Sequence, residues 1–501
     1  MEHCGQFALL RRALRLPGFR QLRLAGDWIL NWHERLPMLA FPEKQICLLG
    51  DAWQVRPDRG TPEEEIQKLG PAPDYESVLR MEESWCGRYV LLCGGRVFPD
   101  ATGLLPVFYG AAGISSDCLL LAEEMGLAPR VHTCREVLNW MPGPCTHYPE
   151  ISRLLPSQAY DLHSGACVSK PLFARDVPEY GDEDALIEGF SAFFCTGLQN
   201  LHAAYPRQKL LLALTGGYDS RTLFALAIRA GVPFDAFTLE HDHMLIGDLE
   251  LPKQLCDRSG VRLISIERDR DAYSPARERA YTEHTAGLVR DEDRLFYAYG
   301  QYQRLLEPYG EALFLRSSIW ETAVEFFPRM FDRDGPTEAF YTGMELTAPC
   351  PEREAVDRYF AWCAAHPEDG IGLCDRFYWE QRAGCWLSSI EQGFDLLKHG
   401  RTVQPLNSRL LLTLLFRFPR EERLTKRHQV RIIEAACPAL SDIPFSGKRR
   451  RGETALTRAA GKLKKAAHRL QMLGLRKTVR LYAAKLSPAA GKTEKQTDTP
   501  T

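Results

Sequence analysis

The stretch LTGGYDSR, residues 214–221, combines two adjacent glycines with hydroxyl side chains and a carboxylate. Backbone N–H groups at the glycine pair 216–217 can approach an anion closely, because no side chain covers them. Thr215 and Ser220 add hydroxyl donors, and Asp219 places a carboxylate beside them. The spacing matches neither the G-x-G-x-x-G dinucleotide turn nor the G-x-x-x-x-G-K-[ST] P-loop. These residue types predict a phosphate-binding turn of another kind.

Such a turn needs a strand before it and a helix after it. Residues 210–214 are an apolar run typical of a buried strand, and residues 220–230 are helix formers that end at Gly231. The positive N-terminus of that helix would point at the same place as the glycine N–H groups. Ligands of parallel-sheet proteins bind beyond the carboxyl ends of the strands. The turn therefore lies where a ligand is expected.

The residues around the turn alternate between strand and helix patterns. A helix is predicted over 182–204, a second strand over 233–240, a second helix over 248–260 and a third strand over 261–267. This alternation predicts right-handed β-α-β units on a parallel sheet. From about residue 269 to residue 438 the pattern is mainly helical and aromatic.

Residues 1–175 differ from this pattern, because short apolar runs are separated there by turn residues, which predicts a strand-rich part with some helices. The length of 501 residues favours two or three domains. The composition, 45% hydrophobic and 26% charged with a net charge of -2, is that of a soluble globular protein. No apolar run is long enough for a transmembrane helix and the N-terminus lacks a secretory pattern, so we expect a cytoplasmic protein. The 15 cysteines are scattered and never form C-x-x-C, which favours reduced thiols over a disulfide or zinc framework.

Charge is distributed unevenly along the chain. Residues 448–485 contain 13 Lys or Arg and one acid, Glu453, so this segment carries +12 and the rest of the chain -14. Leucines seven residues apart within it predict a basic amphipathic helix over 447–486. That helix could pack on the acidic body of the protein, contact an anionic membrane surface or bind nucleic acid. The near absence of aromatic residues disfavours nucleic acid. Residues 487–501 are predicted to be a disordered tail.

The turn resembles the S-G-G-x-D-S motif of the ATP pyrophosphatases, and LTGGYDSR is most similar to the asparagine synthetase-like branch of that family. Residues 87–110, GRYVLLCGGRVFPDATGLLPVFYG, and residues 151–165 resemble the class II glutamine amidotransferase domain found at the N-terminus of this family. Residues 377–389 and 403–419 resemble the late helices of its synthetase domain.

The resemblance implies an α/β fold with an α+β N-domain. An amidotransferase-like β-sandwich flanked by helices is expected over 1–175, and a parallel-sheet adenine-nucleotide-binding synthetase domain with a largely helical C-terminal half over 176–446. In the family the glycine loop holds the pyrophosphate of ATP and its aspartate binds Mg²⁺, which implies Asp219 as the metal ligand here. Independently of the resemblance, the loop EHDHMLIGD, residues 240–248, follows the second predicted strand and is expected to belong to the nucleotide site. A plain polar loop is the alternative, and a transition-metal site through His241, Asp242 and His243 is disfavoured because no third ligand is identifiable. The nucleotide-binding residues implied by position are Leu214, Thr215, Gly216, Gly217, Tyr218, Asp219, Ser220 and Thr238.

The chain departs from the family pattern at three places. A working amidotransferase needs an N-terminal cysteine, whereas Glu2 follows the initiator here and Cys4 is the first cysteine, so no glutaminase activity is expected. The second acidic motif, S-G-E-G-x-D-E, is missing; the matching place is 313–327, where Glu321 is the candidate carboxylate and a helix start with a serine N-cap is the alternative. Lys448 matches the family's catalytic lysine, although it opens a run of four basic residues that is also typical of a solvated or partner-binding patch.

The implied activity is that of an ATP-dependent carbon–nitrogen ligase. It would activate a carboxylate as an acyl-adenylate with pyrophosphate release and transfer it to ammonia or an amine, using ATP and Mg²⁺. The partners would be small-molecule or peptide carboxylates and amines, and no pattern favours a particular oligomeric state. The alternative is a degenerate, non-catalytic nucleotide-binding homologue that acts at a membrane or on a partner protein.

Overall fold

A computed structural model describes residues 3–129, 140–241, 244–268, 274–289, 295–327, 330–332, 335–344 and 346–447. The described residues all belong to one compact unit, which lies within residues 1–451. The predicted basic helix beyond Gly447, the candidate Lys448 and the predicted tail over 487–501 lie outside the described residues.

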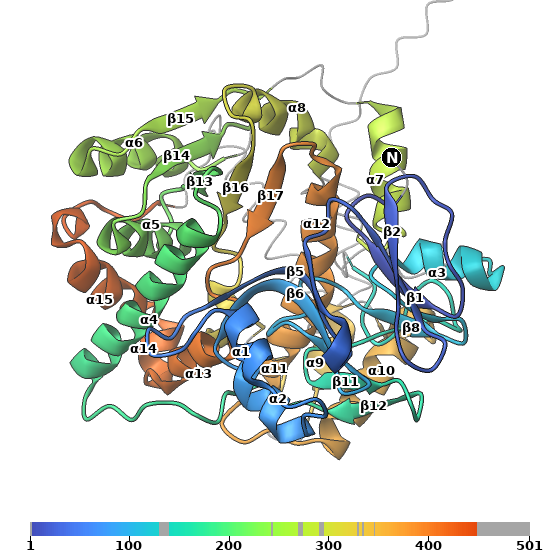
Figure 1. Cartoon of the computed structure of the whole chain (residues 1–501). Helices are drawn as coiled ribbons and strands as arrows, with labels where there is room; N and C mark the ends of the chain where they lie inside the picture. The colour runs from blue at the N-terminus through green and yellow to red at the C-terminus, as the bar shows by residue number, and fades with distance from the viewer. Residues whose placement is uncertain are drawn as a thin grey trace, which may run out of the picture. The chain divides into compact units, whose positions relative to one another are not determined.

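Two antiparallel sheets of six strands each form the N-terminal part of the described chain (Figure 1). The first has the order β10-β8-β9-β1-β3-β2 and contains β1 (Phe7–Leu10), β2 (Phe19–Arg23), β3 (Ile29–His33), β8 (Phe108–Gly110), β9 (Gly113–Ser115) and β10 (Ser152–Arg153). The second has the order β12-β11-β7-β6-β5-β4 and contains β4 (Met38–Phe41), β5 (Ile46–Gln54), β6 (Trp85–Cys93), β7 (Arg96–Pro99), β11 (Gln158–Asp161) and β12 (Ala166–Ser169). Helices α1 (Pro62–Lys68), α2 (Tyr75–Glu82) and α3 (Cys118–Met125) accompany them. The strand-rich N-terminal part predicted from the sequence is confirmed.

Strand β1 shows why the two sheets stack. Phe7 and Leu9 point into a core shared with Leu49 of the second sheet. Leu10 points to the opposite face and packs with Leu121 of α3. Successive side chains of a strand alternate between its faces, so a strand that is buried throughout is covered by one layer on each side. The result is a β-sandwich with helices on its outer faces.

A five-stranded parallel sheet follows in the chain. Its strands are β13 (Lys209–Ala213), β14 (Phe234–Leu239), β15 (Leu263–Ile266), β16 (Ala312–Leu315) and β17 (Gly400–Val403), in the order β15-β14-β13-β16-β17. Each neighbouring pair is parallel, for example Leu210 beside Phe234 and beside Leu313. The first strand is central and the order reverses beside it, so the crevice between β13 and β16 is the topological switch point of the sheet.

Helices cover both faces of this sheet. Leu210 and Leu212 of β13 pack in one core with α4 (Glu183–Ala204), α5 (Tyr218–Ala230) and α15 (Arg427–Ala436), whereas Leu211 faces a second core that includes α8 (Leu295–Leu306). Figure 1 shows α5 and α15 side by side. The other α-helices of the described ranges are α6 (Gly247–Ser259), α7 (Pro275–His284), α9 (Glu338–Gly343), α10 (Pro351–Ala365), α11 (Leu373–Phe377), α12 (Ser388–Gly393), α13 (Arg409–Arg417) and α14 (Arg420–Leu424). A π-helix spans Tyr378–Leu387, and short 3-10 helices include Pro42–Lys44, Phe394–Leu396 and Pro438–Leu440.

For the segment 313–327 the sequence left two possibilities, a site segment that carries the candidate carboxylate Glu321 or a helix that starts at a serine N-cap. Its first three residues belong to β16, and after a loop the chain makes a single 3-10 turn, Trp320–Ala323. The N-cap of that turn is Ile319, without a side-chain cap, so the alternative of an amphipathic helix started by a serine is wrong. The carboxyl end of β16 is followed at once by polar residues because the strand ends at the ligand-binding edge of the sheet.

Buried polar contacts join the sandwich to the parallel-sheet part. Asn407 Nδ2 donates to Asp100 Oδ1 (2.8 Å), and Arg88 makes a two-pronged ion pair with Asp395 (2.7 and 2.9 Å). Both parts therefore belong to one compact unit, and the division at 175/176 stays a prediction. None of the helices in the described ranges is long and apolar enough to cross a bilayer. The described cysteines are free thiols, most of them buried.

Candidate active site

The glycine turn joins β13 to α5 at the switch point. β13 ends at Ala213 and α5 begins at Tyr218, within two residues of the strand and helix predicted from the sequence. Gly217 is the N-cap of α5 and offers no side chain to its first N–H groups. These groups lie just after the carboxyl end of β13, the strand that borders β16, and the N-terminus of a helix stabilises an anion.

Two hydroxyl groups set the shape of the turn. Thr215 N donates to Ser220 Oγ (3.1 Å), and the two side-chain oxygens lie 3.0 Å apart. Gly217 N donates to Thr215 Oγ1 (3.3 Å). Thr238 Oγ1, at the end of β14, donates to Leu214 O (2.8 Å), so this predicted nucleotide-binding hydroxyl is engaged in tying the neighbouring strand to the turn.

Asp248 makes a further contact with the turn. Gly216 N donates to Asp248 Oδ1 (2.9 Å), which belongs to the first turn of α6. The predicted site loop 240–248 thus meets the glycine turn through its last residue, while Asp242 and His243 lie outside the described residues. Sequence reasoning did not single out Asp248; its signal was an acid in the first turn of a helix that follows the second strand of the sheet.

The backbone at Gly216 is tightly enclosed. A Cβ atom there would lie 2.7 Å from Gly247 O and 2.9 Å from Ser446 Cβ. Ser446 N donates to Gly216 O (2.9 Å), so the C-terminal segment lies directly against the turn. At Gly217 the nearest atom to such a Cβ is Thr215 Oγ1, at 3.5 Å. Gly216 is therefore required by packing, whereas Gly217 has room on the side of the crevice.

Arg221 anchors the segment that leads to Lys448. Its guanidinium donates to Ile443 O (2.6 Å) and Pro444 O (2.8 Å) and lies 4.1 Å from the centre of the Phe445 ring. Phe445 in turn stacks on Tyr218, with ring centres 3.9 Å apart. Burial lowers the pKa of Arg221 to about 10. Lys448 follows Ser446 by two residues but lies outside the described residues.

Two carboxylates converge on one ammonium group beside the turn. Lys426 Nζ lies 3.2 Å from Asp219 Oδ1 and 3.6 Å from Glu321 Oε1. Gln429 Nε2 also donates to Asp219 Oδ1 (2.8 Å), and Tyr378 donates its hydroxyl to Glu321 Oε2 (3.2 Å). The structure thus brings together Asp219 and Glu321, two residues singled out from the sequence, around a lysine that was not.

The electrostatics of this group follow from the contacts. Burial raises the pKa of Glu321, the negative charge of Asp219 raises it further, and Lys426 partly offsets both. Lys426 has a left-handed backbone conformation (φ 59°) as the N-cap of α15. In the sequence it stands among several basic residues, which look like a solvated helix face. Its left-handed backbone at the helix start is visible only in the structure, so no pattern in the sequence marked Lys426.

The carboxylates fit Mg²⁺ bound together with a nucleotide. Mg²⁺ is usually held by one or two carboxylates, water and substrate phosphates, and Asp219 and Glu321 supply two such carboxylates within reach of one cation. No group of three or more metal-binding side chains occurs within the described ranges, so a metal held by protein ligands alone is not indicated there. Lys426 balances the charge of the pair in this structure.

The chain was compared with known proteins. No family model and no curated protein matches it. Solved structures similar to it include NMN synthetase from Francisella tularensis, with 18% identity, 30% of this chain and 60% of that chain covered, and a TM-score of 0.21. Another is NH3-dependent NAD synthetase from Campylobacter jejuni, with 15% identity, 29% of this chain and 61% of that chain covered, and a TM-score of 0.19. A third is U34-tRNA thiolase from Methanococcus maripaludis, with 12% identity, 57% of this chain and 86% of that chain covered, and a TM-score of 0.23.

Those likenesses assign no family. The chain spans about three fifths of the first two synthetases, at low identity and low TM-score. The features of this chain that bear on function are the glycine turn, the two carboxylates and Lys426.

Cys4, the first cysteine of the sequence, is buried. Cys4 precedes β1 with a side chain that is 5% exposed, and Arg35 Nη1 donates to its Sγ (3.0 Å). Burial raises the pKa of the Cys4 thiol, and Arg35 only partly offsets this. Because His3 precedes Cys4, this thiol has no α-amino group of its own to serve as a base.

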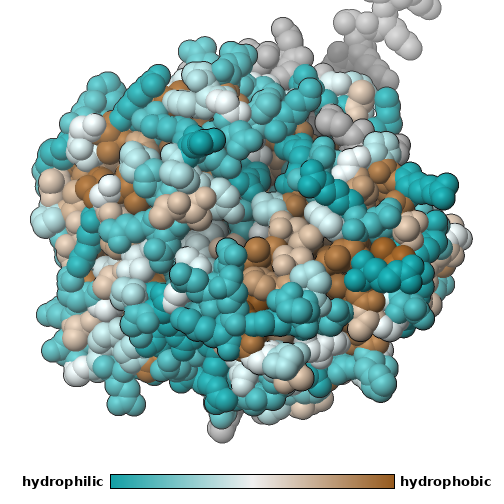
Figure 2. Space-filling model, in the orientation of Figure 1, coloured by the Kyte–Doolittle hydropathy of each residue, from teal (hydrophilic) through white to brown (hydrophobic). Residues whose placement is uncertain are grey.

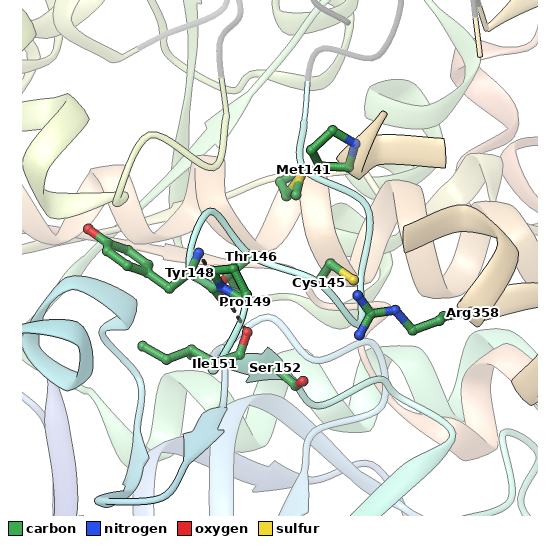
Figure 3. A pocket seen from close by; sticks show the side chains of 9 residues that line it. Met141, Cys145, Thr146, Tyr148, Pro149, Ile151, Ser152 and Arg358 are labelled. Atoms are coloured by element: carbon green, nitrogen blue, oxygen red, sulfur yellow. Dashed lines mark hydrogen bonds between the residues drawn. The ribbon is translucent and has the colours of Figure 1, made fainter. Parts of the chain in front are cut away.

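A small pocket elsewhere is no substitute for the site at the turn. Met141, Cys145, Ile151 and Arg358 are among its lining residues, and Thr146 Oγ1 donates to Ile151 O (2.9 Å) within it (Figure 3). Its volume is about 10 Å³, which is enough for one water molecule. None of the predicted site residues lines it, so it has no place in nucleotide binding.

Proposed function

We propose that this protein is an ATP-dependent, amide-forming ligase of the asparagine synthetase-like kind. The observation that carries the proposal is the convergence of Asp219 and Glu321 on Lys426 beside the glycine turn, at the switch point of the parallel sheet. The N–H groups of residues 215–217 donate to protein oxygens in this structure. The donors for phosphate oxygens are therefore the first N–H groups of α5, which have no side-chain cap, and the hydroxyls of Thr215 and Ser220. The carboxylates offer a place for Mg²⁺, which would neutralise charge on the polyphosphate.

The reaction has two steps. A carboxylate oxygen of the substrate attacks the α-phosphorus of ATP, and the bond to the bridging oxygen breaks, so that pyrophosphate leaves with the electron pair. The nitrogen of ammonia or of an amine then attacks the acyl carbon. The carbon–oxygen bond to AMP breaks, and the nitrogen loses a proton to a base.

The residues of the site have distinct roles in this chemistry. The turn over 215–220 positions the departing pyrophosphate. Lys426 lies beside both carboxylates and is placed to balance charge that develops on the phosphates, a role that the family resemblance also gives to Lys448. Glu321 accepts the proton of the amine or helps Asp219 to hold the metal, and its raised pKa suits a proton acceptor.

The nitrogen source is external in this proposal. Cys4 has a buried thiol and no free α-amino group, so glutamine hydrolysis within the chain is not part of the reaction. Free ammonia, or an amine on a small molecule or peptide, would take its place. The carboxylate is likewise a small molecule or the side chain or terminus of a peptide.

One contact favours the alternative of a non-catalytic nucleotide-binding protein. The N–H of Gly216, which would otherwise be free to bind a phosphate, donates to the carboxylate of Asp248. In that case the basic segment over 447–486 would dominate function by contact with an anionic membrane surface or a partner. The membrane surface and the partner protein are both proposals, and binding of nucleic acid is disfavoured by the scarcity of aromatic residues in this segment.

Pyrophosphate release distinguishes the two. Wild type and Asp219→Ala are incubated with Mg²⁺-ATP and a panel of carboxylates that includes aspartate. Release that needs both a carboxylate and Asp219 supports the ligase. Nucleotide binding without release for any carboxylate supports the binding protein.

A further inference from the structure

A second cavity lies at one end of the β-sandwich. It is bounded by the β2–β3 turn of the first sheet and by the β6–β7 and β11–β12 hairpins of the second, with Arg11 after β1 and Gln45 before β5. Its volume is about 320 Å³. Small-molecule sites start at about 300 Å³, so this cavity has room for a compact ligand.

The floor of the cavity is apolar. Leu92 is 3% exposed, and Leu24 and Leu162 are half-buried; all three belong to the core that the two sheets share. The cavity is therefore the place where the inside of the sandwich reaches the surface. In Figure 2 apolar atoms appear among hydrophilic ones over the region where Figure 1 draws β1, β5 and β6.

The rim is cationic, and one of its charges is not matched. Arg96 makes an ion pair with Asp161 (3.0 Å). Arg11 has its guanidinium 3.7 Å from the centre of the Trp28 ring, and no acidic side chain of the described residues pairs with it. A guanidinium over an indole ring keeps N–H groups that can donate to an anion, and the indole beside it supplies apolar surface.

Backbone contacts hold the walls in place. Ala25 N donates to Gln45 Oε1 (2.7 Å), and Gln45 Nε2 donates to Pro42 O (2.7 Å). Leu162 N donates to Gly95 O (2.9 Å) and so fixes the two hairpins to each other. The cavity is preformed, so the protein loses little conformational entropy when a ligand binds there.

We propose that this cavity binds a small organic anion with a flat apolar body. The carboxylate of the ligand pairs with Arg11, and its body lies on Trp28 and on the leucines of the floor. An organic cation of the same shape is disfavoured, because it would meet an unmatched positive charge at the rim. None of the candidate active-site residues lines this cavity, so the proposal does not depend on the ligase activity.

Binding of 2-naphthoate to the full chain tests the proposal, measured by titration calorimetry. Naphthalen-2-ylmethylamine is the cationic probe of matched shape. Arg11→Glu is the test variant, and Arg15→Glu, an exposed arginine four residues away, is the matched control. We expect naphthoate to bind wild type, Arg15→Glu and Asp219→Ala equally, and Arg11→Glu at least about tenfold more weakly.

Three results would overturn it. They are no binding of naphthoate at millimolar concentration, equal binding of naphthoate and the amine, and binding that is insensitive to Arg11→Glu. Loss of binding in Asp219→Ala with retention in Arg11→Glu would place the anion at the active site and is included in the third result. Arg11 is exposed, so its replacement leaves the fold intact, and circular dichroism verifies this.

Discussion

Lys426 Nζ lies 3.2 Å from Asp219 Oδ1, although the two residues are 207 positions apart in the chain. Asp219 is in the first turn of α5 and Lys426 caps α15, the helix packed beside it. Glu321, which follows β16, lies 3.6 Å from the same nitrogen. The site is therefore assembled from three segments that meet only when the parallel sheet and its helices are formed.

The first prediction concerns this lysine. Lys426→Met removes the cation between the two carboxylates and the charge that faces the phosphates, so the rate of pyrophosphate release should fall by about 10²–10³. Arg427→Met is the matched control, because Arg427 is exposed and only reaches Glu422 at 3.8 Å. A Lys426→Met enzyme with the wild-type rate would remove this residue from the reaction.

The second prediction is a pH dependence. Burial, aided by Asp219, raises the pKa of Glu321. A carboxyl that must be ionised to assist the reaction loses that form as pH falls, and here it does so at a higher pH than an ordinary glutamate, whose pKa is about 4.3. Pyrophosphate release should therefore decline on the acid side while ordinary carboxyls are still ionised. The measurement is the initial rate between pH 4 and pH 8, at saturating ATP.

The control for that profile is Glu321→Gln. This variant should be slower and should lack the acid limb, because its amide does not titrate. Since pyrophosphate leaves before the amine attacks, the rates are measured without added amine, and the profile reports Glu321 in its metal-holding role and not as acceptor of the amine's proton. An acid limb that persists unchanged in Glu321→Gln would assign the titration to another group.

The third prediction links stability to pH through His428 in α15. Burial lowers the pKa of His428 to about 4, against about 6.5 for a free histidine. Between these values the unfolded chain binds more protons than the folded one, so the free energy of unfolding decreases as pH falls from about 6.5 to about 4. The loss amounts to about 2–3 kcal/mol from this group. Urea unfolding at pH 7 and pH 4.5 measures it.

His428→Gln keeps a polar side chain near Glu422 O, which His428 Nδ1 contacts at 3.0 Å. The variant is expected to be less stable at neutral pH but to lose less stability on acidification. If wild type and variant lose the same amount between pH 7 and pH 4.5, the acid sensitivity lies elsewhere.

The fourth prediction separates the two glycines of the turn. Gly216→Ala places a Cβ against the Gly247 carbonyl at 2.7 Å, which should lower the free energy of unfolding by about 1–3 kcal/mol. Gly217→Ala meets nothing closer than 3.5 Å and should fold normally, yet its methyl group would stand where the phosphates approach. Denaturant unfolding and the KM for ATP are the two readouts. Equal effects of both substitutions on stability would contradict the assigned packing.

Local patterns made part of this structure predictable. The apolar run before the glycines, the helix formers after them and Gly231 at the helix end are adjacent in sequence, so β13 and α5 follow from nearest neighbours. The strands β16 and β17 have only four residues each and were hidden within a helical, aromatic region. Their pairing with β13 and with each other is a tertiary property that no window of sequence contains.

Only the part of the site that lies within one sequence motif was predictable. Asp219 and the hydroxyls of the turn lie within one motif and could be named from it. Lys426 and Asp248 reach the turn from distant segments. The only local signal of Asp248 is its place in the first turn of a helix, and the residues around Lys426 look like a solvated helix face. Glu321 was placed by resemblance, and its contact with Lys426 depends on the end of β16 lying next to the end of β13.

The most direct measurement is pyrophosphate release from Mg²⁺-ATP by wild type and by Asp219→Ala across a panel of carboxylates that includes aspartate. We expect wild type to release pyrophosphate with at least one carboxylate, only when that acid is present, and we expect the rate to fall by about 10² or more in Asp219→Ala. Gln199→Ala, a substitution outside the site, serves as the folding control. Nucleotide binding by wild type without pyrophosphate release for any acid, or release that is equal in Asp219→Ala, would contradict it.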